Sequence, residues 1–339
     1  MVLPNKKHMK YLRIVMLAFG LSFGVQQAQA QIDPHFSQYY ANPLWLNPAL
    51  TGVTDGDYRV NVNAKQQWDA LRNGYLTAGA SFDMAPVKNL SLGGIIINQR
   101  AGDIGYNQLS ALASAAYRIR FGQSGEQIIN FGMQAGIINK SLDISKITTG
   151  SQYNPILGYD PSMSISDDIS SSSYVAPDIN AGIMFFDGST NKKVNVFAGA
   201  SVSHLTRPKD KFIAGDNPRL PMRFTGHGGA RIQVNNMLDI TPNFIYLKQG
   251  NAREIAAGAY AQMMLNAESD ILFGSNYRVD DSAIAFLGVH FKSMVIGVSY
   301  DFNTSSLNKA TGARGGLELS VSFTSRKGIV GPNFFCPRL

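Results

Sequence analysis

Apolar and polar residues alternate along most of this chain with a period of two. The clearest example lies near the C-terminus, where Leu317, Leu319 and Val321 alternate with Glu318 and Ser320. Side chains that alternate in this way point to opposite faces of a β-strand. Apolar residues at helical spacing are scarce, so the pattern predicts an all-β protein.

The alternating segments are long for a soluble protein. Many run for about 9–12 residues, whereas soluble strands average about 5–6 and a tilted strand needs about 9–11 to cross a bilayer. The second face carries mostly Gly, Ser, Asn and Gln, which suits an enclosed lumen better than bulk water. We therefore predict a transmembrane antiparallel β-barrel of about fourteen strands, at 58–68, 75–84, 91–100, 107–121, 127–140, 178–186, 193–205, 222–233, 238–248, 253–265, 271–279, 283–291, 293–303 and 314–323.

The connections between these strands differ in length in a regular way. If the chain starts in the periplasm, the long connections all face outward, and they are 141–177, 206–221 and 304–313. The connections that face the periplasm are short, down to the tight turn at Lys292. Short periplasmic turns and long external loops are the rule for outer-membrane barrels. The Ser- and Asp-rich loop 141–177 is either a mobile or partner-binding segment or an ordinary surface loop.

The first thirty residues have the features of an export signal. Lys6, Lys7, Lys10 and Arg13 precede an apolar run that is too short to span a bilayer, and Ala28-Gln29-Ala30 follows as a small-x-small cleavage pattern. The alternative is a retained N-terminal anchor. We predict cleavage near Ala30, a signal at 1–30, a periplasmic or plug segment at 31–57, a barrel at 58–323 and a periplasmic tail at 324–339, in the outer membrane among its lipids.

Charge and chemistry exclude several functions. Removing the four signal charges from the formal net charge of +7 leaves +3, which gives no reason to expect nucleic acid. Cys336 is the only cysteine, so an intrachain disulfide and a thiolate zinc site are excluded; it either stays unpaired or pairs with another chain. The histidines are scattered and no nucleophile–base set is recognisable. We expect no enzyme activity, no metal and no cofactor.

Four cations lie at predicted lumen positions. One reading is an anion-selective constriction, and the other is ion pairing with a plug or with lumen acids such as Asp239, Asp301 and Glu318. The second reading is favoured. The cations are Arg59, Lys65, Arg118 and Arg120.

The segment before the first strand is the most distinctive. It combines three prolines with four aromatic residues, so it should be ordered but irregular, packed in the lumen or across the periplasmic mouth. It resembles the PorP/SprF family of Bacteroidota outer-membrane proteins in the pattern D-P-x-F-S-Q-x-x-x-x-P-L-x-L-N-P-A-x-x-G. The matching residues are Asp33, Pro34, Phe36, Ser37, Gln38, Pro43, Leu44, Leu46, Asn47, Pro48, Ala49 and Gly52. Thr51 is a minor departure, and the ending Cys336-Pro337-Arg338 is also similar to the family's C-terminus.

The resemblance implies a non-enzymatic role with the type IX secretion system. Its expected partners are secretion components, a large secreted surface adhesin, or both, in secretion, anchoring or gliding. The motif itself reads equally well as a structural plug and as a docking surface. The polar, basic lumen leaves an alternative function open, a channel for small solutes.

Overall fold

The computed structural model describes residues 33–68, 74–122, 126–154, 156, 158–160, 162–163, 171–212, 218–266 and 268–325. The predicted signal at 1–30 lies outside the described residues. So does Cys336, with all of the predicted tail after Ser325.

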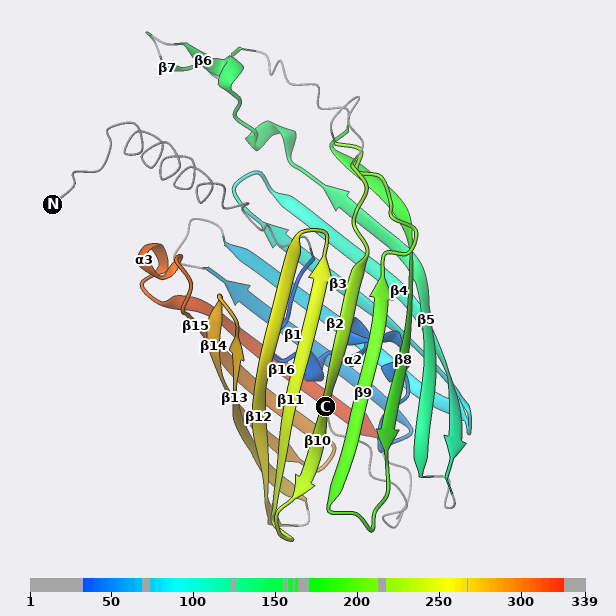
Figure 1. Cartoon of the computed structure of the whole chain (residues 1–339). Helices are drawn as coiled ribbons and strands as arrows, with labels where there is room; N and C mark the ends of the chain where they lie inside the picture. Colours follow the sequence, from blue (N-terminus) through cyan, green and yellow to red (C-terminus); the bar gives the residue numbers. More distant parts are fainter. Residues whose placement is uncertain are drawn as a thin grey trace, which may run out of the picture.

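Fourteen strands close into an antiparallel barrel, as the alternation predicted (Figure 1). Their order around the ring is β1-β16-β15-β14-β13-β12-β11-β10-β9-β8-β5-β4-β3-β2. The bounds are β1 Tyr58–Gln67, β2 Tyr75–Val87, β3 Leu90–Ala101, β4 Tyr106–Phe121, β5 Gln127–Ser141, β8 Ser173–Asp187, β9 Val194–Ser203, β10 Arg223–Gln233, β11 Leu238–Gln249, β12 Ala252–Asn266, β13 Ser269–Arg278, β14 Ser282–Phe291, β15 Met294–Asn303 and β16 Arg314–Ser325.

The barrel closes where its first and last strands meet. β1 pairs with β16 from Tyr58↔Ser325 to Gln67↔Gly316, which places Lys65 opposite Glu318. No free sheet edge remains in the ring, so every strand has two paired neighbours. A closed ring is what a β-structure needs in order to satisfy its backbone groups within lipid.

The two faces of the wall follow the sequence alternation. In β16, Leu317, Leu319 and Val321 are exposed, whereas Glu318 and Ser320 are buried. The other strands alternate in the same way, so the exterior is apolar, whereas the inner face of the wall carries most of the polar side chains together with some buried apolar ones. Hydrocarbon solvates such an exterior, which is the arrangement of an outer-membrane barrel. Among the described residues, no helix is both long and apolar enough to cross a bilayer.

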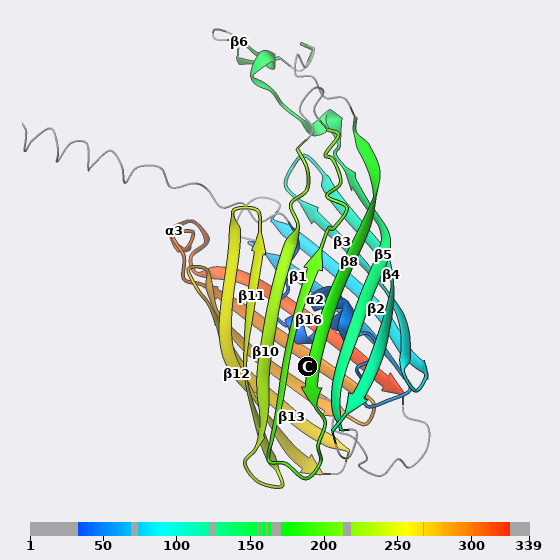
Figure 2. The same cartoon turned by 45° about the vertical axis from the view of Figure 1, so that its right-hand side comes forward.

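The two ends of the barrel differ, and we name them by their connections. At the short-turn end each connection has at most six residues, as in 188–193, and Lys292 takes a positive φ of 56° in one tight turn. The long-loop end carries 142–172, 204–222 and 304–313. Figures 1 and 2 show the described part of the first loop, which carries β6, well beyond the barrel. These loops contain η3 Ile144–Lys146, η4 Gly150–Gln152, β6 Tyr153–Asn154, β7 Gly158–Tyr159 and α3 Asn308–Thr311.

Several predicted boundaries differ from those of the structure; β2, for example, ends at Val87 and not at 84. β8 starts at Ser173 and not at 178, because Pro177 does not end the strand. β9 pairs with β8 only from Ala181 onward. Because Pro177 lies before that point, its missing N–H removes no hydrogen bond between β8 and β9. β16 ends at Ser325 and not at 323.

Candidate functional site

A segment from Asp33 to Val53 lies inside the barrel and is buried along its length except at Ala41, which is half-buried. We call Asp33–Val53 the plug. It contains three short helices, η1 Tyr39–Ala41, α2 Pro43–Leu46 and η2 Pro48–Leu50. Figure 2 shows α2 within the ring of strands.

The two Asn-Pro steps divide the plug into its helices. Pro43 and Pro48 each begin a helix, where a missing N–H costs nothing. The Asn47 side chain accepts a hydrogen bond from Ala49 N at 2.9 Å and so caps η2. Phe36 and Trp45 then pack edge to face, with ring centroids 5.5 Å apart. The apolar core of the protein is therefore in the lumen, between the plug and the wall.

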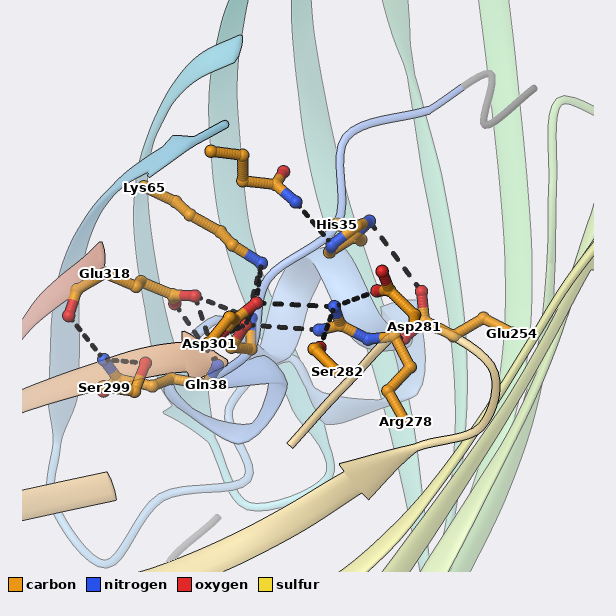
Figure 3. A network of polar contacts seen from close by, with 12 residues as sticks. His35, Gln38, Lys65, Glu254, Arg278, Asp281, Ser282, Ser299, Asp301 and Glu318 are labelled. Carbon is orange, nitrogen blue, oxygen red and sulfur yellow. Dashed lines mark hydrogen bonds and ion pairs between the residues drawn. The ribbon is translucent and has the colours of Figure 1, made fainter. Parts of the chain in front are cut away.

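Ser37 is the centre of a buried polar cluster (Figure 3). Its backbone N–H donates to Glu318 Oε2 at 2.6 Å, and its hydroxyl donates to Asp301 at 2.6 Å. Lys65 Nζ donates to the same hydroxyl at 2.7 Å and pairs with Asp301 Oδ2 at 3.2 Å. Arg278 also donates to Ser37 Oγ, at 3.2 Å. We call Ser37, Lys65, Arg278, Asp301 and Glu318 the ionic seat.

The ionic seat is extended by further acids. Arg278 pairs with Glu254 at 3.2 Å and with Asp281 at 2.7 Å. The His35 ring lies 3.8 Å from Glu254 and also contacts Gln67. Lys65 and Arg278 are thus two cations among four carboxyl groups, so neither buried cation lacks a carboxylate partner.

Gln38 is recognised through its whole side-chain amide. Its Nε2 donates to Ser299 Oγ at 3.2 Å and to the Glu318 carbonyl at 3.1 Å, while its Oε1 accepts from Ser320 Oγ at 2.6 Å. A buried amide with all these contacts satisfied specifies one position of the plug against β15 and β16.

The first plug residue has its own anchor. Asp33 Oδ2 lies 2.6 Å from His204 Nε2 and 3.2 Å from Arg223 Nη1. Burial alone disfavours both ions. The His204 and Arg223 charges nevertheless hold the Asp33 pKa well below its ordinary value. Asp33 and Asp178 correspondingly raise the pKa of His204 to about 9, although burial opposes this.

Glycines shape the opposite wall. An added Cβ at Gly132 would stand 2.2 Å from the Pro48 carbonyl carbon, and one at Gly182 would stand 2.0 Å from Asn47 Oδ1. A Cβ at Gly199 would meet Asn47 Nδ2 at 2.8 Å. Asn47 uses this closeness to donate to the Ile183 carbonyl at 3.0 Å and to contact His227 Nε2 at 3.1 Å. We call Gly132, Gly182 and Gly199 the glycine seat.

The plug ends against two arginines. Arg59 pairs with Asp83 at 2.9 Å and donates to the Leu50 carbonyl at 3.2 Å. Asp83 accepts from Gly52 N at 2.7 Å, and Arg118 donates to Gly52 O at 2.6 Å. Gly52 has a φ of +68° and lies against Ser91 of β3, where an added Cβ would be 2.2 Å from Ser91 Oγ. Only glycine fits both demands.

Contacts with the plug come from the whole circumference. Gln134 of β5 and Ser201 of β9 donate to carbonyl groups of the plug. Asn243 of β11 accepts from the Tyr39 hydroxyl, and the hydroxyl groups of Ser114 of β4 and Thr51 share a hydrogen bond. Tyr40 packs on Tyr260 of β12 and Phe286 of β14, each with centroids 5.5 Å apart. Together with the seats above, every strand of the barrel touches the plug.

The predicted site residues are therefore distributed as follows. All plug-motif residues lie in the lumen, and Arg59, Lys65 and Arg118 contact the plug or lumen acids. Arg120 does not join them, because it lies exposed at the end of β4. Asp301 and Glu318 contact the plug directly, whereas Asp239 pairs with Arg231.

Several contributors were not singled out in the sequence. They include Asp83, His204, Arg223, Arg278 and the glycine seat. Their only sequence signal is an inward position in an alternating segment, which does not say which partner they meet. Among the described residues, no group of three or more His, Cys, Asp or Glu could hold a metal ion.

Several solved structures align with most of the chain. The toluene transporter TbuX of Ralstonia pickettii aligns over 85% of this chain and 94% of its own, with 13% identity and a TM-score of 0.53. The P. putida toluene transporter TodX aligns over 83% and 93%, with 9% identity and a TM-score of 0.47. The CymD monoaromatic hydrocarbon channel aligns over 89% and 97%, with 11% identity and a TM-score of 0.47. At such identity, the likeness to TbuX shows the fold alone.

No curated protein matches the chain. A protein family does, the one described as type IX secretion system membrane protein PorP/SprF, over residues 28–323. The match covers nearly the whole chain, including the plug and almost all of the barrel. The chain belongs to the PorP/SprF family of type IX secretion system membrane proteins.

Proposed function

We propose that this protein assists secretion or surface anchoring of a large adhesin, as a non-enzymatic outer-membrane component that binds other proteins. In this proposal the signal is cleaved near Ala30, the long-loop end faces outward and the short-turn end faces the periplasm. Its partners are type IX secretion components, a secreted adhesin, or both. The orientation follows the rule that outer-membrane barrels keep their short turns in the periplasm.

The occupied lumen is the observation that carries the proposal. The plug touches every strand and is bound by charged, amide and backbone groups, as the contacts of Ser37, Asn47 and Gly52 illustrate. A barrel filled in this way acts through the surfaces at its two ends, because passage through its centre requires the plug to leave.

The loop 142–172 offers such a surface. It carries the β6–β7 hairpin, where Tyr153 and Tyr159 pack with centroids 5.6 Å apart and Ile156 is 91% exposed. Exposed apolar groups on a hairpin that stands clear of the barrel suit contact with another protein. This supports the partner-binding reading of the loop.

Co-purification from native outer membranes tests the proposal. The tagged chain should recover secretion components or a very large surface protein, and the double substitution Tyr153→Ser/Tyr159→Ser should reduce recovery of the surface protein. Leu307→Ser, in another loop at the same end, is the matched control and should leave recovery unchanged. Recovery of neither class of partner by the unchanged chain would contradict the proposal.

The second candidate is a solute channel. The polar inward face favours it, and TbuX, which shares the fold, is a toluene transporter. The paired lumen cations disfavour an anion constriction, because Arg59 faces Asp83 and Lys65 faces Asp301. Reconstitution in planar bilayers separates the candidates: steady conductance by the intact chain supports the channel, and a closed barrel supports the protein-binding role.

A further inference from the structure

Two cations lie side by side on the outer face of the barrel wall at the long-loop end. Lys248 is the last exposed residue of β11, and Arg253 is directly opposite it in β12. A turn of two residues, Gly250 and Asn251, joins the two strands at this end (Figure 1). Side chains directly opposite each other in an antiparallel pair have Cβ atoms about 4.5–5.5 Å apart, so these two charges repel each other. We call Lys248 and Arg253 the rim pair.

No acid neutralises the rim pair within the part of the chain that the structure describes. There, neither side chain forms an ion pair or a hydrogen bond. Glu254, the next residue of β12, pairs instead with Arg278 in the lumen. The exposed Asp280, in the turn after β13, makes no described ion pair either. Because opposed like charges destabilise a sheet, an anion bound between them would remove a repulsion as well as add an attraction.

The residues next to the rim pair mark the edge of the hydrocarbon layer. Tyr246 and Ile255 lie two positions further into their strands, face outward and are each 37% exposed. Tyr277 of the neighbouring β13 is 51% exposed. Exposed aromatic residues form girdles where a barrel passes from lipid into water. Since two residues of a strand span about 7 Å, the rim pair lies at the depth of the lipid headgroups.

A second pair of like charges lies in the adjoining connection. Lys209 and Arg219 are both exposed and face each other across an antiparallel bridge in the loop 204–222. This loop leads into Arg223 of β10, which pairs with Gln249 next to Lys248. The positive charge of the rim pair therefore continues into the loop beside it.

We propose that the rim pair binds the phosphate group of an anionic lipid in the outer leaflet, which in an outer membrane is a phosphorylated glycolipid. The Arg253 guanidinium can donate two parallel hydrogen bonds to one phosphate, and the Lys248 ammonium adds a point charge. The exposed Tyr246, Ile255 and Tyr277 then contact the adjoining acyl chains. A lipid is favoured over an acidic protein because both cations project from the wall at headgroup depth. The inference shares the orientation given in the proposed function but none of its protein partners, so the two can fail separately.

Lipid retention tests the proposal. The tagged full chain, purified in a zwitterionic detergent, is mixed with micelles of phosphatidylcholine and diphosphoryl lipid A, and mass spectrometry measures the lipid that stays bound after washing. The intact chain should retain lipid A in preference to phosphatidylcholine. Lys248→Gln/Arg253→Gln should lower this preference on the order of tenfold, because two charges next to an anionic headgroup are lost.

Two further variants serve as controls. Lys248→Arg/Arg253→Lys keeps both charges and should retain lipid A nearly as well as the intact chain. Arg100→Gln removes an exposed cation of β3 at the same end, whose cross-strand neighbours Leu76 and Asn107 are uncharged. This variant should leave the lipid preference unchanged.

Thermal unfolding of the same proteins gives a second measurement and shows that each variant folds. Lipid A should raise the Tm of the intact chain but not that of Lys248→Gln/Arg253→Gln. Equal retention by these two proteins, or retention that persists when the lipid A has lost its phosphates, would overturn the proposal. So would a double variant that keeps its lipid but loses a protein partner in native membranes, since the rim pair would then bind protein.

Discussion

The two walls that hold the plug use different chemistry. The ionic seat, on β1, β13, β15 and β16, surrounds Ser37 with charged groups at 2.6–3.2 Å. The glycine seat, on β5, β8 and β9, has no side chains and lets Asn47 and Pro48 approach the wall itself. The ionic seat binds the plug through charged side chains, whereas the glycine seat lets the plug lie directly against the backbone of the wall.

The contrast predicts how substitutions in each wall should lower the stability of the protein. Removing one member of a buried charge cluster leaves the others uncompensated, so the cost is electrostatic and large. Adding a methyl group to the glycine seat forces a displacement, so the cost is steric and depends on how far the plug can yield. Both walls position the same segment, so either change should loosen it.

The largest effect should come from Asp301→Asn. The substitution leaves Lys65 and Arg278 facing a neutral amide in a buried site, and the free energy of unfolding should fall by about 3–5 kcal/mol. Urea unfolding in lipid vesicles measures it. Asp281→Asn is the control, because Asp281 also pairs with Arg278 but its side chain is 31% exposed. That variant should lose only about 0–1 kcal/mol, and equal losses would refute the importance of burial.

Raising the pH should weaken the anchor at Asp33. The folded pKa of His204, about 9, lies above its ordinary value of 6.5. Its stabilising contribution is therefore complete below pH 6.5 and lost as the pH rises through 9. The loss should be on the order of 3 kcal/mol, seen as faster proteolysis near Asp33. His204→Gln should remove this pH dependence; a wild-type profile that is flat from pH 6 to 10 would contradict the account.

Substitutions in the glycine seat should cost less. Gly182→Ala and Gly132→Ala place a methyl group against Asn47 or Pro48 and should each lower stability by about 1–3 kcal/mol. Gly226→Ala is the matched strand control, since a Cβ there meets nothing within 4 Å. Unfolding curves of the three variants measure these losses of stability. A control as damaged as the seat variants would show a general cost of replacing strand glycines.

The smallest effect compares adjacent residues of β5. Gln134 donates to the Leu44 carbonyl of the plug at 2.9 Å, whereas Met133 is 62% exposed on the outer face. Gln134→Leu leaves a buried carbonyl unpaired and should cost about 1–2 kcal/mol. Met133→Leu should change stability by less than about 0.5 kcal/mol. If the two variants had the same unfolding curve, the hydrogen bond from Gln134 to the plug would contribute no measurable stability.

The outer face explains why so much of the fold was predictable. Lipid accepts any apolar side chain, so alternation alone marks strands such as β14, β15 and β16. Strand count and closure follow from that pattern. The start of β8 was predicted at 178, five residues later than Ser173, and the residues before Ala181 pair with β5 but not with β9.

The site was predictable only in part, for a physical reason. Lys65 and Asp301 could be assigned to the lumen from their positions, but their meeting at Ser37 depends on ring closure over more than 200 residues. Gly132 and Gly182 carry no chemical signal at all. Their role becomes visible only when the plug is placed against them.

A disulfide between plug and wall tests the central claim most directly. Thr51 Oγ1 and Ser114 Oγ lie 2.5 Å apart, so cysteines at these positions fall within disulfide reach. In a chain carrying Cys336→Ser, the pair Thr51→Cys/Ser114→Cys should oxidise almost completely in outer-membrane preparations. Two thiols that stay reduced and react freely with a maleimide would show that residues 33–53 do not occupy the lumen.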